Sequence, residues 1–366
     1  MKIAQIAPLM ESVPPRFYGG TERVVSYLTE QLVALGHEVT LFASADSVTS
    51  AQLVGCATTA LRLDSNVVDH IPYYMLMLDK VRRLENEFDI LHFHIDYLHF
   101  PLFRGLAGRT VTTLHGRQDL PDNKAIFIEF DDMPLVSISA SQRKSIPDAN
   151  FVANVYHGLP TNVLQPNYNP SGQYLAFIGR MSPEKRPDRA IEIARQFGIP
   201  LKIAAKVDRA DEAYFRETIA PLLNDTNVEF VGEINERDKN EFLGNALGLL
   251  FPIDWPEPFG LVMIEAMACG TPTLAFGCGS VPEIIDCGVS GLIVDSVEAA
   301  VSALPHLLAM DRKKVRQAFE ERFSSTRMAR DYLEIYHRLL NRPVETDRFP
   351  VVNNAATAGI GSESLN

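Results

Sequence analysis

Short apolar segments alternate with longer amphipathic segments along most of this chain, and the alternation starts twice. This pattern is typical of β-α-β units that build a parallel sheet. In the first half, strands are expected at residues 3–7, 38–43, 90–93, 110–114, 135–138 and 151–155. Helices are expected at residues 22–35, just before Gly36, and at residues 72–87.

The second half repeats the pattern after a break. Residues 161–172 are rich in proline and asparagine and have no regular hydrophobic period, so we interpret them as an interdomain linker. Beyond the break, strands are expected at 174–178, 201–205, 228–231, 249–251 and 273–275. Helices are expected at 182–197, 213–223, 237–246, 261–268, 297–308 and 328–340.

A chain of 366 residues suits two such domains. We therefore expect an α/β protein whose two doubly wound parallel-sheet domains face a central cleft, with ligands at the carboxyl ends of the strands. The expected division is a first domain at 1–160, the linker, a second domain at 173–325, a helix at 326–341 and a disordered tail at 342–366.

Composition excludes several classes of protein. The formal net charge of −12 works against binding to nucleic acid phosphates. Four cysteines without C-x-x-C spacing are expected to be free thiols and do not suggest a zinc site. No apolar stretch is long enough to span a bilayer, and the start of the chain has the pattern of a strand, not of a signal peptide. We therefore expect a cytoplasmic protein.

The most informative segment runs from Asp254 to Met267. Prolines on both sides of Glu257 hold it in a stiff loop, and Gly260 lets the following helix N-terminus approach an anion. Glu265 lies about 7.5 Å further along that helix at roughly 1.5 Å per residue, whereas a retaining glycosidase needs carboxyl groups about 5 Å apart. The two carboxylates suit two parts of one ligand better than acid and nucleophile roles. The alternative is that the carboxylate of Glu257 only stiffens its loop and that of Glu265 lies on the surface without a ligand.

A second segment follows the strand expected at residues 174–178. Arg180 comes directly after Gly179 at the end of that strand, and a helix is expected with Ser182 as its N-cap. Lys185 then lies one turn into the helix. Together the guanidinium and the ammonium could neutralise a diphosphate. A solvated helix charge is the alternative for Lys185.

Other strand ends carry weaker signals. Gly19 and Gly20 follow the first strand and could bring backbone N–H groups to a phosphate, although the dinucleotide motif is absent. His115 ends another strand and is therefore expected at the cleft; the alternative is a loop histidine that makes ordinary hydrogen bonds. Ser139 ends a third strand without the G-x-S-x-G elbow of a hydrolase.

Histidines 92, 94 and 99 cluster with Asp96. A metal site is the less favoured interpretation, because a third ligand would lie outside the strand and no cysteine accompanies the group. We predict no metal site, and place His94, Asp96 and Ser139 weakly on the acceptor side of the cleft.

In their order along the chain, the Gly-Gly pair, His115, Gly179-Arg180 with Lys185, and Glu257-Pro-Phe-Gly-x4-Glu265 resemble the retaining nucleotide-sugar glycosyltransferases of family 4, which have the GT-B fold. The resemblance extends from residue 2 to about 340. It departs from the family at His157-Gly158-Leu159-Pro160, where many members have Asn-Gly-Val-Asp.

The resemblance implies a role for each matching residue. Arg180 and Lys185 would bind the donor diphosphate, Glu257 the donor sugar hydroxyls and Glu265 the ribose. Backbone N–H groups at Phe259, Gly260 and Leu261 would cap the phosphates, with Gly19 and Gly20 closing from the first domain, which would hold the acceptor. His115 would contact the transferred sugar, and the last helix would cross back to the first domain.

The function implied is transfer of a hexose from a nucleotide diphosphate sugar to the hydroxyl of a glycan, small molecule or lipid, with retention and by a front-face mechanism. No cofactor or metal would be required, and a UDP-sugar is slightly favoured over a GDP- or ADP-sugar as donor. The alternatives are a sugar-nucleotide epimerase of similar fold and a non-catalytic binding protein.

A membrane contact is a further alternative for residues 72–87, where Tyr73, Met75 and Leu76 precede Lys80 and two arginines. The favoured interpretation is a core-packed helix with a solvated face. If the contact exists, the protein is peripheral at the inner membrane face. The oligomeric state is not determined by the sequence.

Overall fold

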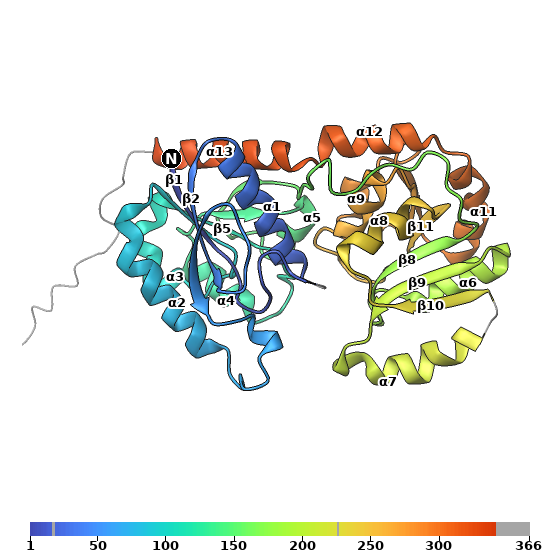
Figure 1. Ribbon diagram of the computed structural model, residues 1–366, viewed down its shortest axis with the longest axis horizontal. Coiled ribbons are helices and arrows are strands. Elements are labelled where there is room, and N and C mark those ends of the chain that lie inside the picture. The colour runs from blue at the N-terminus through green and yellow to red at the C-terminus, as the bar shows by residue number, and fades with distance from the viewer. Residues whose placement is uncertain (17–18, 225–226, 342–366) are drawn as a thin grey trace, which may run out of the picture.

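Two parallel sheets, one in each half of the chain, organise the computed structural model, which describes residues 1–16, 19–224 and 227–341. The two halves lie side by side in Figure 1. The first sheet has the strand order β3-β2-β1-β4-β5-β6-β7. Its strands are β1 (Lys2–Ile6), β2 (Glu38–Ser44), β3 (Gln52–Ala57), β4 (Ile90–Phe93), β5 (Thr110–Thr113), β6 (Leu135–Ser137) and β7 (Phe151–Asn154).

The second sheet has the order β10-β9-β8-β11-β12-β13. Its strands are β8 (Leu175–Arg180), β9 (Leu201–Lys206), β10 (Val228–Gly232), β11 (Gly248–Phe251), β12 (Thr273–Phe276) and β13 (Gly291–Val294). Every strand pair in both sheets is parallel. The order reverses between β1 and β4 and again between β8 and β11, which is the doubly wound arrangement. The predicted fold class is therefore confirmed.

Helices cover the sheets. Those of the first half are α1 (Gly20–Ala34), α2 (Ile71–Leu84), α3 (Phe100–Phe103), α4 (Asn123–Glu129) and α5 (Ala140–Arg143). Those of the second half are α6 (Pro187–Phe197), α7 (Glu212–Tyr214), α8 (Glu236–Gly244), α9 (Leu261–Ala268), α10 (Val281–Ile284), α11 (Val297–Leu308), α12 (Arg312–Arg322) and α13 (Ser325–Leu340). Strands β3 and β13 and helix α12 were not anticipated from the sequence, nor were the short helices α3, α4, α5 and α10.

The last helix, α13, packs on the first sheet although it follows the second one in sequence (Figure 1). Ser324 caps its N-terminus by accepting a hydrogen bond from the Arg327 N–H. Its buried face includes Met328, Tyr332 and Tyr336, which join the hydrophobic cluster under β1, β4 and β5. Burial of this apolar stripe holds the end of the chain on the first domain.

The chain crosses between the two halves twice, and the two crossings lie against each other. The N–H of Leu159 donates to the carbonyl of Phe323 at 2.9 Å, and the N–H of Ser325 donates to the carbonyl of Leu159 at 2.8 Å. Gly158 packs so closely on the backbone of Ser324 that a Cβ atom would overlap it. The glycine of the segment that departs from the family pattern is therefore required by this contact.

Two arginines of α12 hold the segment that was interpreted as a linker. Arg316 donates to the carbonyls of Thr161 at 2.7 Å and Leu164 at 2.9 Å, and Arg312 donates to the carbonyl of Asn167 at 2.6 Å. These bonds satisfy backbone acceptors that no sheet or helix pairs. The predicted tail at 342–366 lies outside the described residues.

Candidate functional site

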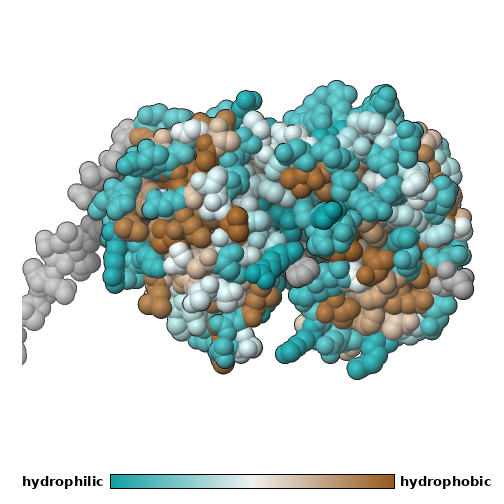
Figure 2. Space-filling model, viewed as in Figure 1, coloured by the Kyte–Doolittle hydropathy of each residue, from teal (hydrophilic) through white to brown (hydrophobic). Residues whose placement is uncertain are grey.

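A cavity of about 510 Å³ lies between the two domains, at the carboxyl ends of β1, β5, β8 and β9. Figure 2 shows hydrophilic side chains where the two halves of the surface meet. Ten predicted residues from both domains line this cavity: Gly19, Gly20, His115, Arg180, Lys185, Glu257, Phe259, Gly260, Leu261 and Glu265. Residues that are up to 246 positions apart in sequence, from 19 to 265, thus share one site.

Arg180 is the last residue of β8, and its guanidinium lies 3.2 Å from the Glu184 carboxylate. The helix predicted to start at Ser182 instead begins at Pro187. A helix starting at Ser182 would place Pro187 in its interior, where the ring lacks an N–H and clashes with the preceding turn. The chain therefore makes a tight turn, in which Arg186 has a φ of 54°, before α6 begins.

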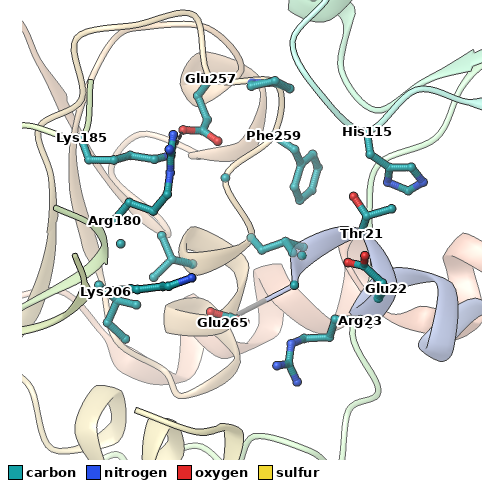
Figure 3. A pocket seen from close by; sticks show the side chains of 18 of the residues that line it. Thr21, Glu22, Arg23, His115, Arg180, Lys185, Lys206, Glu257, Phe259 and Glu265 are labelled. Carbon is teal, nitrogen blue, oxygen red and sulfur yellow. Dashed lines mark hydrogen bonds and ion pairs between the residues drawn. The ribbon is translucent and has the colours of Figure 1, made fainter. Parts of the chain in front are cut away.

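That turn directs Lys185 into the cavity, where its ammonium forms an ion pair with the Glu257 carboxylate. Figure 3 shows the two side chains pointing toward each other. The indole N–H of Trp255 donates to the same carboxylate oxygen at 2.9 Å, and the ammonium lies 5.1 Å from the centre of the indole ring. Both side chains of the ion pair are largely buried, at 14% and 11% exposure.

A glycine turn supports the Glu257 loop from behind. Gly279 has a φ of 60°, and a Cβ atom there would lie 2.5 Å from the Glu257 carbonyl oxygen. Ser280 donates its N–H to that carbonyl at 3.0 Å and its hydroxyl to the carbonyl of Phe259 at 2.9 Å. The turn next to Cys278 therefore fixes the loop that carries Glu257.

Two helix N-termini face the cavity. Helix α9 begins after Gly260, whose φ is 80°, and α1 begins after Gly19; neither helix has a side chain that caps its first N–H groups. A Cβ atom on Gly20 would lie 3.3 Å from the side chain of Leu261, so the glycine pair of the first domain packs on the start of α9. Uncapped N–H groups and the positive ends of two helix dipoles suit an anion such as a diphosphate.

Glu265 is buried on α9 and its carboxylate lies 2.7 Å from the ammonium of Lys239. That ammonium also lies 3.7 Å from the Glu236 carboxylate. Glu236 in turn forms an ion pair with Arg23 of α1 and accepts a hydrogen bond from the Tyr27 hydroxyl at 3.3 Å. Lys239, Glu236 and Arg23 all line the cavity and were not predicted.

His115 follows β5 and lines the cavity beside Thr21 of α1 (Figure 3). Its ring stacks on the ring of His157 with centres 5.2 Å apart, and His157 packs on Phe259 at 4.7 Å. Burial lowers the pKa of His115 to about 3. The imidazole is therefore neutral at physiological pH and does not supply a positive charge.

The structure does not bring the residues placed weakly on the acceptor side to the cavity. Ser139 has no exposed surface and accepts a hydrogen bond from the Gln142 N–H as the cap of α5. Asp96 has a φ of 51°, and burial raises its pKa. His94 lies behind His115, whose Nε2 is 2.9 Å from the His94 Nδ1.

The other histidines of that cluster are engaged in hydrogen bonds with hydroxyl groups. His92 lies 2.7 Å from the Tyr336 hydroxyl and 2.8 Å from that of Thr113, and His99 lies 2.9 Å from the hydroxyl of Thr112. Within the described part of the chain, no three histidine, cysteine or acidic side chains form a group that could hold a metal ion.

Two further cations that were not predicted line the cavity, one at a strand end and one in the loop after a strand. Lys206 is the last residue of β9 and pairs in register with Arg180, so the two cations end neighbouring strands. Arg117 lies two residues after His115, and its guanidinium lies 3.6 Å from the Glu184 carboxylate across the cleft.

No helix of the described ranges is long and apolar enough to cross a membrane.

Two protein-family models match this chain. The model described as "Glycosyl transferases group 1" matches residues 164–323, and the model "Glycosyltransferase Family 4" matches residues 18–144. The phosphatidyl-myo-inositol mannosyltransferase of Mycolicibacterium smegmatis is 24% identical over 98% of this chain and 99% of its own length.

The D-inositol 3-phosphate glycosyltransferase of the same organism is 28% identical over 48% of this chain, a match that spans 42% of that enzyme. Among solved structures, Anabaena Alr3699/HepE in complex with UDP and glucose superposes with a TM-score of 0.72 at 16% identity, over 92% of this chain and all of the other. These comparisons agree with the fold.

Proposed function

The chain belongs to glycosyltransferase family 4 and has the GT-B fold, and from that premise we propose that it is a retaining enzyme. It transfers a hexose from a nucleotide diphosphate sugar to an acceptor hydroxyl. One observation carries the proposal: Arg180, Lys185 and the uncapped N-termini of α1 and α9 converge on a single cavity. Two cations and two helix N-termini form a site for a diphosphate without a metal ion.

The donor lies along the second domain. Arg180 and Lys185 bind the diphosphate, and the N–H groups at Gly260 and Leu261 cap it. Glu257 accepts hydrogen bonds from sugar hydroxyls, and Glu265 accepts them from the ribose. The ion pair between Lys185 and Glu257 supports this proposal, because the residue proposed to bind the diphosphate lies next to the residue proposed to bind the sugar.

In the chemical step, the bond between the anomeric carbon and the diphosphate oxygen breaks, and its electron pair stays on the diphosphate. The acceptor hydroxyl attacks the anomeric carbon from the same face, and its proton passes to a donor phosphate oxygen. Arg180, Lys185 and the start of α9 stabilise the charge that develops on the leaving group. His115, neutral and half-buried, contacts the transferred sugar and transfers no proton.

UDP is the proposed nucleotide of the donor, with uracil as its base. Support comes from the fold shared with Alr3699/HepE, which was solved with UDP and glucose. A thermal-shift panel of UDP, GDP and ADP and their sugars tests the choice, because a ligand that binds only the folded protein raises its stability. A larger shift with GDP or ADP than with UDP would contradict it.

The acceptor lies on the first domain and is a glycan, a small molecule or a lipid. A lipid acceptor would involve α2, which exposes Ile71, Met75 and Leu76. The basic side chains of α2 are already engaged: Lys80 bonds to a backbone carbonyl, and Arg82 and Arg83 pair with acidic neighbours. Flotation with vesicles of anionic lipid tests the contact. If the protein does not bind the vesicles at low salt, the acceptor is a glycan or a small molecule.

Glu257→Gln and Arg180→Ala test the assignment of the site. Each should reduce the rate of transfer a hundredfold or more, which is about 3 kcal/mol for one electrostatic contact. Glu229→Gln and Arg195→Ala are matched controls, because both residues lie in exposed ion pairs outside the cavity. Turnover close to that of the unchanged protein in both cavity variants would defeat the assignment.

Product analysis separates this function from the two alternatives. Transfer gives a glycoside that retains the donor's anomeric configuration, an epimerase gives an altered sugar nucleotide without an acceptor, and a binding protein gives neither. The rate should be unchanged in excess chelator, because Arg180 and Lys185 supply the charge that a divalent cation would bring. Loss of activity in chelator, restored by Mg²⁺, would contradict the proposed metal independence.

A further inference from the structure

A continuous row of buried polar side chains runs behind His115, from the first strand to the last helix. The Nε2 atom of His115 lies 2.9 Å from the Nδ1 atom of His94, and the Nε2 atom of His94 lies 2.7 Å from the Oε1 atom of Gln5. The amide nitrogen of Gln5 donates to the Tyr336 hydroxyl at 3.2 Å. Gln5, His94 and Tyr336 are 0%, 3% and 0% exposed, so water does not substitute for these partners.

The chemistry of these groups fixes where the ring protons lie. An amide oxygen only accepts hydrogen bonds, so the proton of His94 is on Nε2. His94 is buried and neutral, which leaves its Nδ1 atom as an acceptor. The nitrogen that faces it, Nε2 of His115, must therefore carry the proton of the His115 ring. The Nδ1 atom of His115 is then unprotonated; it is buried next to the cavity and has no hydrogen-bond partner among the described residues.

The far end of the row sets the orientation of the Gln5 amide. The Tyr336 hydroxyl lies 2.7 Å from the Nδ1 atom of His92 as well as 3.2 Å from the Gln5 amide nitrogen. The Tyr336 hydroxyl accepts from the Gln5 amide nitrogen, so its single proton is directed to His92. The amide oxygen then faces His94. The last helix, which returns from the second domain, thus fixes the first link of the row.

On the basis of the proposed function, we propose that Gln5 and His94 are positioning residues that hold the His115 ring as the Nε2–H tautomer. The ring then offers Nδ1 as a hydrogen-bond acceptor to a hydroxyl group of the bound substrate. A bare nitrogen attracts a hydroxyl proton and repels phosphate oxygens, so it directs the sugar, and not the diphosphate, to this end of the cavity.

Nuclear magnetic resonance of the whole protein with ¹⁵N-labelled histidine tests the tautomer without any assay of transfer. Long-range correlations distinguish protonated from unprotonated ring nitrogens, and a His115→Asn variant identifies the His115 signals among the nine histidines. We expect a protonated Nε2 and an unprotonated Nδ1 in the ligand-free protein at neutral pH. A protonated Nδ1 on His115 would overturn the proposal, whatever the enzyme's activity.

Kinetics test the positioning role. Gln5→Leu and His94→Leu should each reduce kcat about tenfold, roughly the effect of one hydrogen bond, with the KM for the donor changed less than threefold. His94→Asn places an amide oxygen near the former Nδ1 atom, so it should keep both the His115 tautomer and a kcat within threefold of the unchanged protein.

Thr112→Val is the matched control, since it removes a buried hydrogen bond between a threonine and His99 on the strand that precedes His115, outside the row. Its kcat should be unchanged. Equal losses in His94→Asn, His94→Leu and Thr112→Val would show a merely structural effect and overturn the proposal. If the unchanged protein transfers no sugar, the proposed function fails, while the spectra still decide the tautomer.

Discussion

Arg23 of the first domain and Glu236 of the second form an ion pair across the edge of the cavity. Arg23 lies three residues after Gly20, and Glu236 is the first residue of α8. The Arg23 side chain is 9% exposed and that of Glu236 is 27% exposed, so solvent screens the pair only partly. Through Lys239 the contact extends to Glu265, the proposed ribose ligand. The same network thus joins the two domains and holds the side chain that we propose binds the donor ribose.

Breaking this pair should weaken donor binding more than it slows the chemical step. For Arg23→Gln and Glu236→Gln we expect the KM for the donor to rise roughly tenfold, the effect of one charge-assisted hydrogen bond, with kcat changed less. Small-angle scattering should show a larger radius of gyration for the ligand-free variants. The double variant should be less impaired than the two losses combined, because no unpaired charge remains. Strictly additive losses would show that the two residues act separately.

The ion pair between Lys185 and Glu257 contributes to stability before any substrate binds. Lys185→Met leaves a largely buried carboxylate without its cation, so we expect a loss of about 3 kcal/mol in the free energy of unfolding. Glu257→Gln should cost less, since its amide oxygen still accepts the Trp255 N–H. Urea unfolding measures both. If the double variant with Lys185→Met and Glu257→Gln is no more stable than Lys185→Met alone, the loss of stability does not come from the unpaired carboxylate.

Gly279 should be irreplaceable for the position of Glu257. In Gly279→Ala the new methyl group would overlap the backbone of Glu257, so we expect transfer to fall at least tenfold, about 1.4 kcal/mol, together with a lower Tm. Gly288→Ala is the matched control: Gly288 has a φ of 85° but no atom within 4 Å of the added Cβ. The control has the backbone strain alone, about 1 kcal/mol. Equal activity in the two variants would contradict the supporting role of the turn.

Stability should fall as the pH drops below neutrality. Burial lowers the pKa of His37 and, more strongly, of five further histidines, so between their folded values and the unfolded value near 6.5 the unfolded chain binds more protons. The stabilisation is present above about pH 6.5 and is lost progressively as the pH falls toward the folded pKa values, which for His115 is about 3. Buried carboxyl groups with a raised pKa, such as that of Glu22, act in the opposite direction at lower pH. The five histidines are His92, His94, His99, His115 and His157.

Urea unfolding at pH 7 and pH 5 should show a decrease of at least about 2 kcal/mol, the contribution of one such histidine over that interval. His99→Phe should flatten the pH dependence, because it removes a titrating group outside the cavity. A free energy of unfolding that is constant from pH 7 to pH 5 would contradict the neutral state of these rings.

The fold could be predicted because hydrophobic period and loop residues are local signals. Helices 261–268 and 297–308 begin and end at the predicted residues. Strand β3 was missed because it lies at an edge of the sheet, where its residues are only half-buried and give no continuous apolar run. The serine cap pattern predicts a helix start at Ser182, but α6 begins at Pro187, because a proline is unfavourable in a helix interior and favourable in its first turn.

The site could be predicted only in part, for a physical reason. Strand ends and glycines near helix starts mark a shared edge, and this placed Arg180, Glu257 and His115 at the cavity. Other partners come from distant elements: Lys239 of α8 pairs with Glu265, and Tyr336 of the last helix accepts a hydrogen bond from Gln5. No spacing rule in the sequence connects Gln5 with a side chain 331 residues away. Such contacts exist only once the two sheets and α13 are assembled.

The paired crossings at Leu159 and Ser324 limit how the domains can move. The two interdomain segments are hydrogen-bonded to each other, so they permit rotation of one domain about the line that they define. Sliding or twisting of one domain past the other would break the Leu159–Phe323 and Leu159–Ser325 hydrogen bonds. We therefore expect the cleft to open and close mainly by rotation about this line. Such a rotation would return the glycine pair of α1 to the same position next to the start of α9, where we propose that the donor diphosphate binds.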